Sequence, residues 1–333
     1  MTDPRSLILS GAPEGYDAAL LVREIEKSGG PVVHVARDAR RLAAMEAALD
    51  FFAPDITRIT FPGWDCLPYD RVSPNPDVSA TRMATLAALA HGLPTQRFIV
   101  LTTLSAATQR VPAREVLQEA SFTARVDHRL DIDALRGFLV RMGFAQAPTA
   151  TEPGDFAVRG GIIDIYPPGE SGPVRLDLFG DVLDGARRFD PVTQRTTETL
   201  AVVELAPVSE VILDEAAITR FRQNYRIEFG AGTSDDPLYE AVSAGRKHQG
   251  AEHWLPFFHE TLETLFDYLP GATVMLDDQF TAARVSRWEG IADQYDTRRE
   301  AMTRKDRMDT VYKPCPPGLL YLDEGAFDAA IAD

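Results

Sequence analysis

Residues 154–167 read GDFAVRGGIIDIYP, and residues 174–196 read VRLDLFGDVLDGARRFDPVTQRT. Both stretches contain short runs of β-branched and aromatic residues, and glycine or proline separates these runs, as at Gly160-Gly161. Short runs of this composition between such turns are typical of antiparallel strands. The pattern predicts an antiparallel sheet with strands at residues 156–159, 162–166, 173–179, 182–189 and 199–205.

A single helix is predicted before these strands. Leu130, Leu135, Leu139 and Met142 recur at helical spacing and would form one apolar face. One helix packed on an antiparallel sheet makes a small α+β arrangement with its own core. We therefore expect a separate antiparallel unit at residues 119–209.

The first 118 residues follow a different pattern, because predicted strands and helices alternate along them. Alternation of this kind indicates a parallel sheet with helices on its faces, so the expected fold class is α/β. We call residues 1–118 the αβ unit. Its expected strands are residues 7–9, 31–36, 56–61 and 98–102, and its expected helices are residues 14–28, 39–52 and 79–90.

The last part of the chain, residues 210–333, has mostly helical periodicity, and we call it the helical unit. Its expected helices are residues 214–228, 236–244, 260–266 and 278–304, with one strand at residues 273–276.

The turn after the first predicted strand has the position of a phosphate-binding loop, because it would connect a strand to a helix. Such a loop needs glycine, glycine-lysine and then serine or threonine, where this chain has Ser10, Gly15, Tyr16 and Asp17. Tyrosine thus replaces the lysine that meets phosphate, and a carboxylate replaces the magnesium-binding hydroxyl. An acidic residue at a helix N-terminus also repels phosphate. The sequence predicts an inactive nucleotide loop, which is either a relic or an unrelated turn.

The composition excludes several classes of protein. The 333 residues are 45% hydrophobic and 25% charged, which is ordinary for globular domains. Fifty acidic and 34 basic residues give a net charge of −16, which disfavours non-specific binding to nucleic acid. Two cysteines, Cys66 and Cys315, are too few for a disulfide framework and suit a cytoplasmic protein. The histidines lack metal-ligand spacing and no apolar run could span a membrane, so we expect neither a metal nor a membrane.

Three stretches together resemble one known family. Residues 61–86, FPGWDCLPYDRVSPNPDVSATRMATL, contain the string WDxLPYD, and the stretches quoted first contain FAxRGGxxDIYP and FDPxTQRT. In this order and spacing they are similar to the N-terminal module of the bacterial transcription-repair coupling factors (Mfd). That module is itself similar to the excision-repair protein UvrB. The resemblance covers nearly all 333 residues.

The resemblance implies a fold. It implies a parallel-sheet, RecA-like domain with a degenerate P-loop (domain 1A), an inserted α+β domain (domain 2) and a helical subdomain (domain 1B). These would correspond to the αβ, antiparallel and helical units. One element of UvrB is missing, because the chain passes from Asp70 to the helix at residues 79–90 without room for UvrB's long DNA-clamping hairpin.

The resemblance also implies partners. Domain 2 would bind UvrA, the damage-recognition ATPase, and the motor and regulatory domains of a longer coupling factor would be further partners. The chain would then be an N-terminal fragment without a cofactor of its own. Arg159, Arg175 and Phe179 match the family positions implicated in UvrA binding.

The strand predicted at residues 173–179 supports a docking surface independently. Side chains alternate between the faces of a strand, so Arg175, Asp177 and Phe179 would share the face opposite Leu176. Arginine and aromatic residues are enriched where proteins bind one another. The alternative is that Phe179 packs beneath a loop and that the two arginines neutralise a neighbouring acid, which could be Asp155, Asp164, Asp177 or Asp184.

The sequence does not decide which residues of the next predicted strand, residues 182–189, belong to the docking surface. A bulge near Gly180-Asp181 would make the faces of residues 182–189 uncertain, so Arg187 and Arg188 are only possible contributors to the surface.

Three functions therefore compete. The leading one is a non-catalytic interaction module that recruits UvrA to stalled transcription complexes. A nucleotide-dependent helicase would need Gly-Lys-Ser/Thr, which occurs nowhere in the sequence. A DNA-binding repair domain would need a basic stripe with interleaved aromatic residues, whereas residues 154–190 contain four arginines against seven acidic residues.

Overall fold

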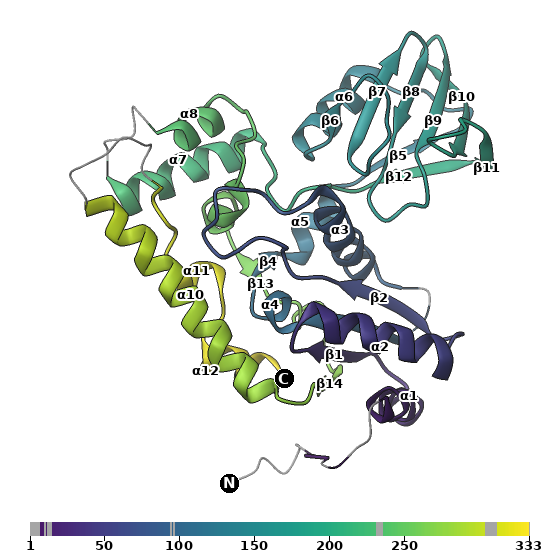
Figure 1. Cartoon of the computed structure of the whole chain (residues 1–333). Coiled ribbons are helices and arrows are strands. Elements are labelled where there is room, and N and C mark those ends of the chain that lie inside the picture. Colours follow the sequence, from purple (N-terminus) through teal and green to yellow (C-terminus); the bar gives the residue numbers. More distant parts are fainter. Residues whose placement is uncertain are drawn as a thin grey trace.

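The computed structural model describes residues 7–9, 11, 15–93, 95, 97–230, 236–303 and 312–332. The chain has a mixed α/β fold with one parallel sheet and separate antiparallel sheets. The antiparallel unit stands apart at the upper right of Figure 1, and the parallel sheet with its helices lies below it.

The parallel sheet has four strands, in the order β14-β1-β3-β2. They are β1 (Val32–Ala36), β2 (Thr57–Phe61), β3 (Phe98–Thr103) and β14 (Thr273–Leu276). Every residue of β1 and β3 is buried, as expected for parallel strands covered on both faces. One face is covered by α1 (Tyr16–Ser28) and α2 (Ala39–Phe52), and the other by α3 (Pro76–His91), α10 (Phe280–Thr303) and α12 (Glu324–Ala330).

The strand predicted at residues 7–9 is wrong. Leu7, Ile8 and Leu9 belong to no strand and are exposed. The fourth strand is instead β14, which pairs in parallel with β1 from Val32 to Val35 and comes from the helical unit. Since β3 pairs with the other edge of β1, no edge of β1 remains for a strand from residues 7–9.

The antiparallel unit has a six-stranded sheet, in the order β11-β10-β9-β8-β7-β6. Its strands are β6 (Ala145–Gln146), β7 (Asp155–Arg159), β8 (Ile162–Ile165), β9 (Val174–Phe179), β10 (Val182–Phe189) and β11 (Thr196–Leu200). The predicted helix is α6 (Ile132–Arg141), which packs on one face of the sheet. The strand predicted at residues 199–205 is divided, because β12 (Val202–Leu205) leaves the sheet and pairs with β5 (Phe122–Arg125).

The helical unit contains an aromatic core. It lies among α7 (Glu215–Phe229), α8 (Pro237–Ser243), the 3-10 helix η1 (Ala251–Trp254), α9 (Leu255–Phe258) and α11 (Pro317–Leu320). Tyr69, from the loop after β2, is buried in the same core, so the loop and the helices are packed together. The helix predicted at residues 260–266 is wrong, since Leu262–Glu263 forms β13 and pairs with β4 (Val111–Pro112).

The helical unit also contributes to the core of the αβ unit. Leu265, Phe280 and Phe327 pack in one cluster with Val33 and Val100 of the parallel sheet. The domain boundaries at residues 118 and 209 therefore stay a prediction.

A buried ion pair attaches the residue that directly follows the antiparallel unit, Glu210, to the αβ unit. Arg82 of α3 binds Glu210 with 2.7 Å between Nη2 and Oε1, and both side chains are almost fully buried. Trp64 donates from Nε1 to Oε2 of the same carboxylate at 2.9 Å. A loop of the antiparallel unit also approaches α3 closely, since a Cβ on Gly169 would lie 2.5 Å from Cβ of Ala84. These contacts hold the sheet in a defined orientation.

Candidate protein-docking surface

The six-stranded sheet has one face against α6 and one face turned away from it, which we call the outer face. On β9, Val174 and Leu176 are buried against α6, whereas Arg175, Asp177 and Phe179 alternate with them onto the outer face. Cross-strand pairing adds residues of the neighbouring strands to this face. The outer face includes Asp155, Ala157, Arg159, Ile162, Asp164, Arg175, Asp177, Phe179, Val182, Arg187 and Phe189.

Phe179 is the most exposed aromatic residue of this face, with 83% of its surface accessible. It ends β9 directly before Gly180, whose φ of 65° is left-handed and suits the hairpin turn to β10. A second hairpin turn lies alongside, because Leu178 donates its backbone N–H to the carbonyl oxygen of Gly161 at 2.8 Å. The alternative in which Phe179 packs beneath a loop is therefore wrong.

Asp164 lies in the middle of the outer face and is fully buried. Arg175 donates to it through Nε at 2.7 Å and through Nη2 at 2.8 Å, and Arg159 donates through Nη2 at 2.6 Å. These hydrogen bonds raise the pKa of Arg175. The two arginines thus do neutralise an acid, as the alternative proposed, but they differ in exposure. The side chain of Arg159 is 51% accessible and that of Arg175 is 20% accessible.

Two further residues hold Arg175 in place. Gln194, in the turn after β10, accepts a hydrogen bond from Nη2 of Arg175 at 3.1 Å. The guanidinium also lies over the ring of Phe189, 4.5 Å from its centroid. We did not predict either contact from the sequence, because both depend on the register of β10 and on the turn that follows it.

The structure shows which arginine of β10 belongs to the outer face. The predicted bulge is present between Leu183 and Gly185. Beyond it, Arg187 lies directly opposite Arg175 and binds Asp177 at 2.6 Å, so Arg187 belongs to the outer face. Arg188 lies opposite Val174 on the other face and pairs with Glu170 and Glu198.

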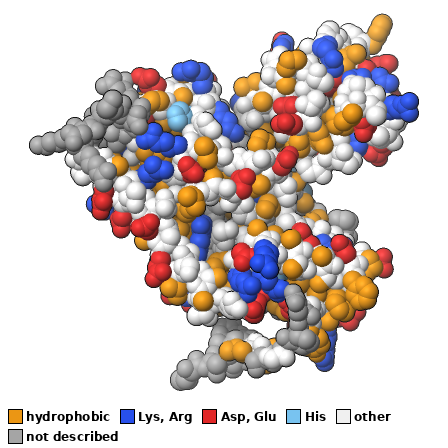
Figure 2. Space-filling model, viewed as in Figure 1, with side chains coloured by type: hydrophobic (Ala, Val, Ile, Leu, Met, Phe, Trp, Pro, Cys, Tyr) orange, Lys and Arg blue, Asp and Glu red, His pale blue; other side chains and the backbone are white. Residues whose placement is uncertain are grey.

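The outer face therefore combines an exposed aromatic side chain with two arginines that share one carboxylate, that of Asp164. Its three arginines are balanced by three aspartates on strands β7 to β9, whereas the whole chain has a net charge of −16. Figure 2 shows basic side chains next to acidic and apolar ones at the right-hand margin of the antiparallel unit. An arrangement of this kind suits a protein surface that is acidic around an apolar hollow.

The predicted nucleotide loop, at residues 10–17, lies only partly within the described residues. Ser10 lies outside the described residues, and Gly15 precedes α1 with a left-handed φ of 80°. Tyr16 is partly exposed, whereas the carboxylate of Asp17 binds Nη2 of Arg41 on α2. Arg41 also binds the buried Asp277 at 2.9 Å. Because residues 7–9 form no strand, the strand-to-helix connection that suggested the loop is absent from the described residues.

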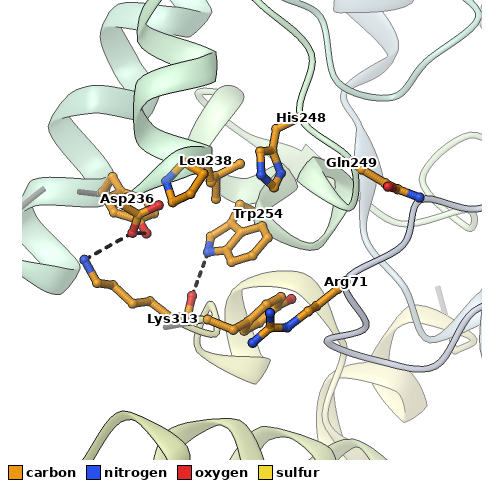
Figure 3. Close-up of a pocket in the computed structure, with 10 residues that line it drawn as sticks. Arg71, Asp236, Leu238, His248, Gln249, Trp254 and Lys313 are labelled. Atoms are coloured by element: carbon orange, nitrogen blue, oxygen red, sulfur yellow. Dashed lines mark hydrogen bonds and ion pairs between the residues drawn. The ribbon is translucent and has the colours of Figure 1, made fainter. Parts of the chain in front are cut away.

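A cavity of about 170 Å³ lies elsewhere, between α8, η1 and the loop that carries Arg71. Figure 3 shows Lys313 bound to Asp236, and Trp254 donating from Nε1 to the backbone oxygen of Lys313 at 2.8 Å. Cofactor pockets usually have about 300–1,000 Å³. The cavity is smaller than these and is not lined by α1, so it offers no support for a nucleotide site.

Other candidate chemistry is limited. The tertiary structure brings Sγ of Cys66 to 3.9 Å from Nε2 of His253. Burial raises the pKa of Cys66 to about 12 and lowers the pKa of His253 to about 4, so the pair is neutral at pH 7 and the thiol is unreactive. Within the described ranges, no three His, Cys, Asp or Glu side chains converge as metal ligands, and no helix could span a membrane.

Comparison with known proteins identifies the class of module that carries the outer face. Residues 122–211 match the family model described as the UvrB interaction domain. These residues comprise almost all of the antiparallel unit, including every strand from β5 to β12.

Most of the chain is similar to a portion of proteins described as transcription-repair-coupling factors. It is 34% identical to that of Escherichia coli (strain K12) over 292 residues, which are 84% of this chain and 25% of the relative. The protein of Haemophilus influenzae is 32% identical over 86% of this chain and 25% of its own length. That of Bacillus subtilis (strain 168) is 26% identical over 81% and 24%. The resemblance inferred from the sequence is thus confirmed, and the chain spans about a quarter of the length of these relatives.

Proposed function

We propose that this chain is a non-catalytic interaction module of a cytoplasmic transcription-repair coupling factor, and that it recruits UvrA to stalled transcription complexes for nucleotide excision repair. The observation that carries the proposal is the outer face, on which Phe179 is exposed and which also bears the half-exposed Arg159 and Arg187. The similarity to coupling factors and to the UvrB interaction domain supports the same partner class.

Phe179 would be the centre of the contact. An aromatic side chain that loses most of its exposed surface on binding can contribute strongly to affinity. Arg159 would bind carboxylates at the rim, since guanidinium pairs with carboxylate through two parallel hydrogen bonds. The partner surface on UvrA would accordingly be acidic around an apolar hollow.

The αβ unit would support this module without binding a nucleotide. We infer that it is a degenerate RecA-like domain, because its parallel strands alternate with helices and residues 10–17 lack the Gly-Lys-Ser/Thr of a phosphate-binding loop. Asp17 keeps a negative charge at the N-terminus of α1, which disfavours phosphate there. A helicase function would therefore need a nucleotide site other than this one.

Direct DNA binding would be weak. The net charge of −16 opposes the approach of duplex DNA, and the arginines of the outer face are already paired with aspartates. A fluorescence-anisotropy titration with duplex DNA at physiological salt is expected to show little binding. Tight binding with a steep salt dependence would favour the DNA-binding alternative.

The experiment that tests the proposal is a calorimetric titration of this chain with UvrA. Phe179→Ala is expected to weaken binding by about 1–3 kcal/mol, as truncation of a central contact does. Phe51→Ala is the matched control, because Phe51 is 80% accessible but lies on α2, far from the outer face in sequence and in fold. Both variants should fold, since exposed substitutions usually change stability by less than about 0.5 kcal/mol. Equal affinities of the two variants would place the interface elsewhere.

A further inference from the structure

Asp164 is the residue of the outer face that needs an explanation. It is a fully buried carboxylate in the middle of β8, flanked by Ala157 of β7 and Arg175 of β9. Burying a charge is unfavourable unless it is paired, and replacing a buried ion pair with apolar residues often increases stability. Fold stability alone therefore gives little reason for an aspartate at this position.

The hydrogen bonds of Asp164 engage both of its oxygens. Oδ1 accepts from Nε of Arg175, and Oδ2 accepts from Nη2 of Arg175 and from Nη2 of Arg159. Arg175 thereby forms a bidentate pair, which fixes the plane of its guanidinium. Arg159 uses only Nη2 in this contact, so Nε and Nη1 of this half-exposed side chain remain for another acceptor.

One carboxylate thus orders two arginines that come from different strands. A long side chain that is free in the unbound protein loses rotamer freedom when it binds a partner, and this loss weakens the complex. A side chain that is already ordered loses much less. Because one negative charge serves two cations, the pair of arginines also keeps a positive charge for the partner.

We propose that Asp164 is a positioning residue for the docking surface, which holds Arg159 and Arg175 in the conformation that binds an acidic protein surface. The inference rests on the proposed function, because the partner is the UvrA surface assigned above. Asp164 itself is buried and would not touch that partner.

The test compares Asp164→Asn with the wild-type chain. Asparagine keeps the volume but removes the charge, and its amide group is a donor where the arginines need an acceptor. Two immobilised side chains would be released, so affinity for UvrA is expected to fall about 5- to 150-fold. Asp164→Leu provides a second variant, because an apolar replacement can keep the sheet stable while the arginines lose their acceptor.

A double-mutant cycle separates positioning from general destabilisation. If Asp164 acts through the arginines, Asp164→Asn should have much less effect on affinity in the Arg159→Ala, Arg175→Ala background. In the free chain, the Nε–H signal of Arg175 should be sharp and protected from exchange in NMR spectra, and Asp164→Asn should remove that protection. The NMR signal checks that the variant releases the guanidinium, and the cycle then decides the role: if Asp164 served only to stabilise the fold, Asp164→Asn would weaken binding equally in both backgrounds.

The outcomes separate this inference from the proposed function. Phe179→Ala that weakens binding, together with folded Asp164→Asn and Asp164→Leu variants of unchanged affinity, would overturn the role of Asp164 and leave the function intact. An equally large effect of Asp164→Asn on affinity in the Arg159→Ala, Arg175→Ala background would also overturn the role of Asp164. Failure of the wild-type chain to bind UvrA would overturn both.

Discussion

Two clusters of charged side chains in this chain have opposite stoichiometry. At the N-terminus of α1, one arginine, Arg41, pairs with three carboxylates, those of Asp17, Asp277 and Asp278. On the outer face of the antiparallel unit, one carboxylate, Asp164, binds two arginines. The first cluster keeps a surplus negative charge and the second a surplus positive charge.

This difference in net charge explains why the two clusters favour ligands of opposite charge, although both consist of arginine and aspartate side chains. Hydrogen bonds from Arg41 and from the backbone of Arg37 lower the pKa of Asp277, even though burial acts in the opposite direction. Asp277 therefore stays ionised at neutral pH, and the carboxylates of this cluster repel phosphate. Charge surplus, and not the number of charged residues, decides which ligand each cluster suits.

The largest expected effect is the loss of stability when the arginine of the first cluster is removed. Arg41→Ala would leave the buried Asp277 without its main partner, so we expect a loss of about 3–5 kcal/mol in the free energy of unfolding. Urea denaturation measures this loss. Arg40→Ala on the same helix is the control, since Arg40 is exposed and should change stability by less than about 0.5 kcal/mol. Equal stability of the two variants would mean that the cluster has no structural role.

The next effect concerns binding through the second cluster. Arg159→Glu should weaken UvrA binding more than the 1–3 kcal/mol expected for Arg159→Ala, by about 3 kcal/mol or more, because repulsion is added to the lost pair. Stability should change much less than with Arg41→Ala, since Arg159 is half exposed. Arg136→Glu reverses the same charge on an exposed position of α6, across the sheet, and should leave the affinity unchanged. Calorimetry on the three proteins distinguishes a local contact from a general effect of charge.

A smaller expected effect is a pH dependence of the folding stability that arises from His34. His34 on β1 is fully buried with no hydrogen bond to either ring nitrogen, and burial lowers its pKa to about 4. The unfolded chain therefore binds a proton near pH 6.5 that the folded chain does not. Stability from this residue is complete above pH 6.5 and is lost as the pH falls toward 4, by about 2 kcal/mol between pH 7 and pH 5.

The measurement is urea denaturation at pH 7 and pH 5, in the wild-type chain and in His34→Leu. The variant should lose less stability on acidification, although His253, whose pKa burial also lowers to about 4, will retain part of the dependence. An unchanged pH dependence in His34→Leu would show that folding does not lower the pKa of His34.

The smallest expected effect is an attempted repair of the nucleotide loop. Tyr16→Lys restores the missing lysine, but Asp17 and its pair with Arg41 remain. We expect no measurable ATP affinity in calorimetry with magnesium, for the variant as for the wild-type chain. Micromolar binding by either protein would contradict the charge argument for the first cluster.

Local pattern was sufficient for much of the fold and for the central candidate residues. The period of two along β9 separates Leu176 from Arg175 and Phe179, and the sequence predicted this division. Most helices and strands also begin and end near their predicted positions, because caps such as Asp38 and apolar spacing are features of neighbouring residues. These elements depend on interactions within a few residues, which a single sequence contains.

Only the tertiary structure decided which distant segments meet. It replaced the expected strand at residues 7–9 with β14, which starts only at Thr273, because periodicity does not show which of several segments pairs with β1. It also chose Asp164 as the shared acceptor of two arginines, since strand register and the β10 bulge set cross-strand neighbours. Residue types and their faces follow from the sequence, whereas charge stoichiometry follows from contacts between segments far apart in it.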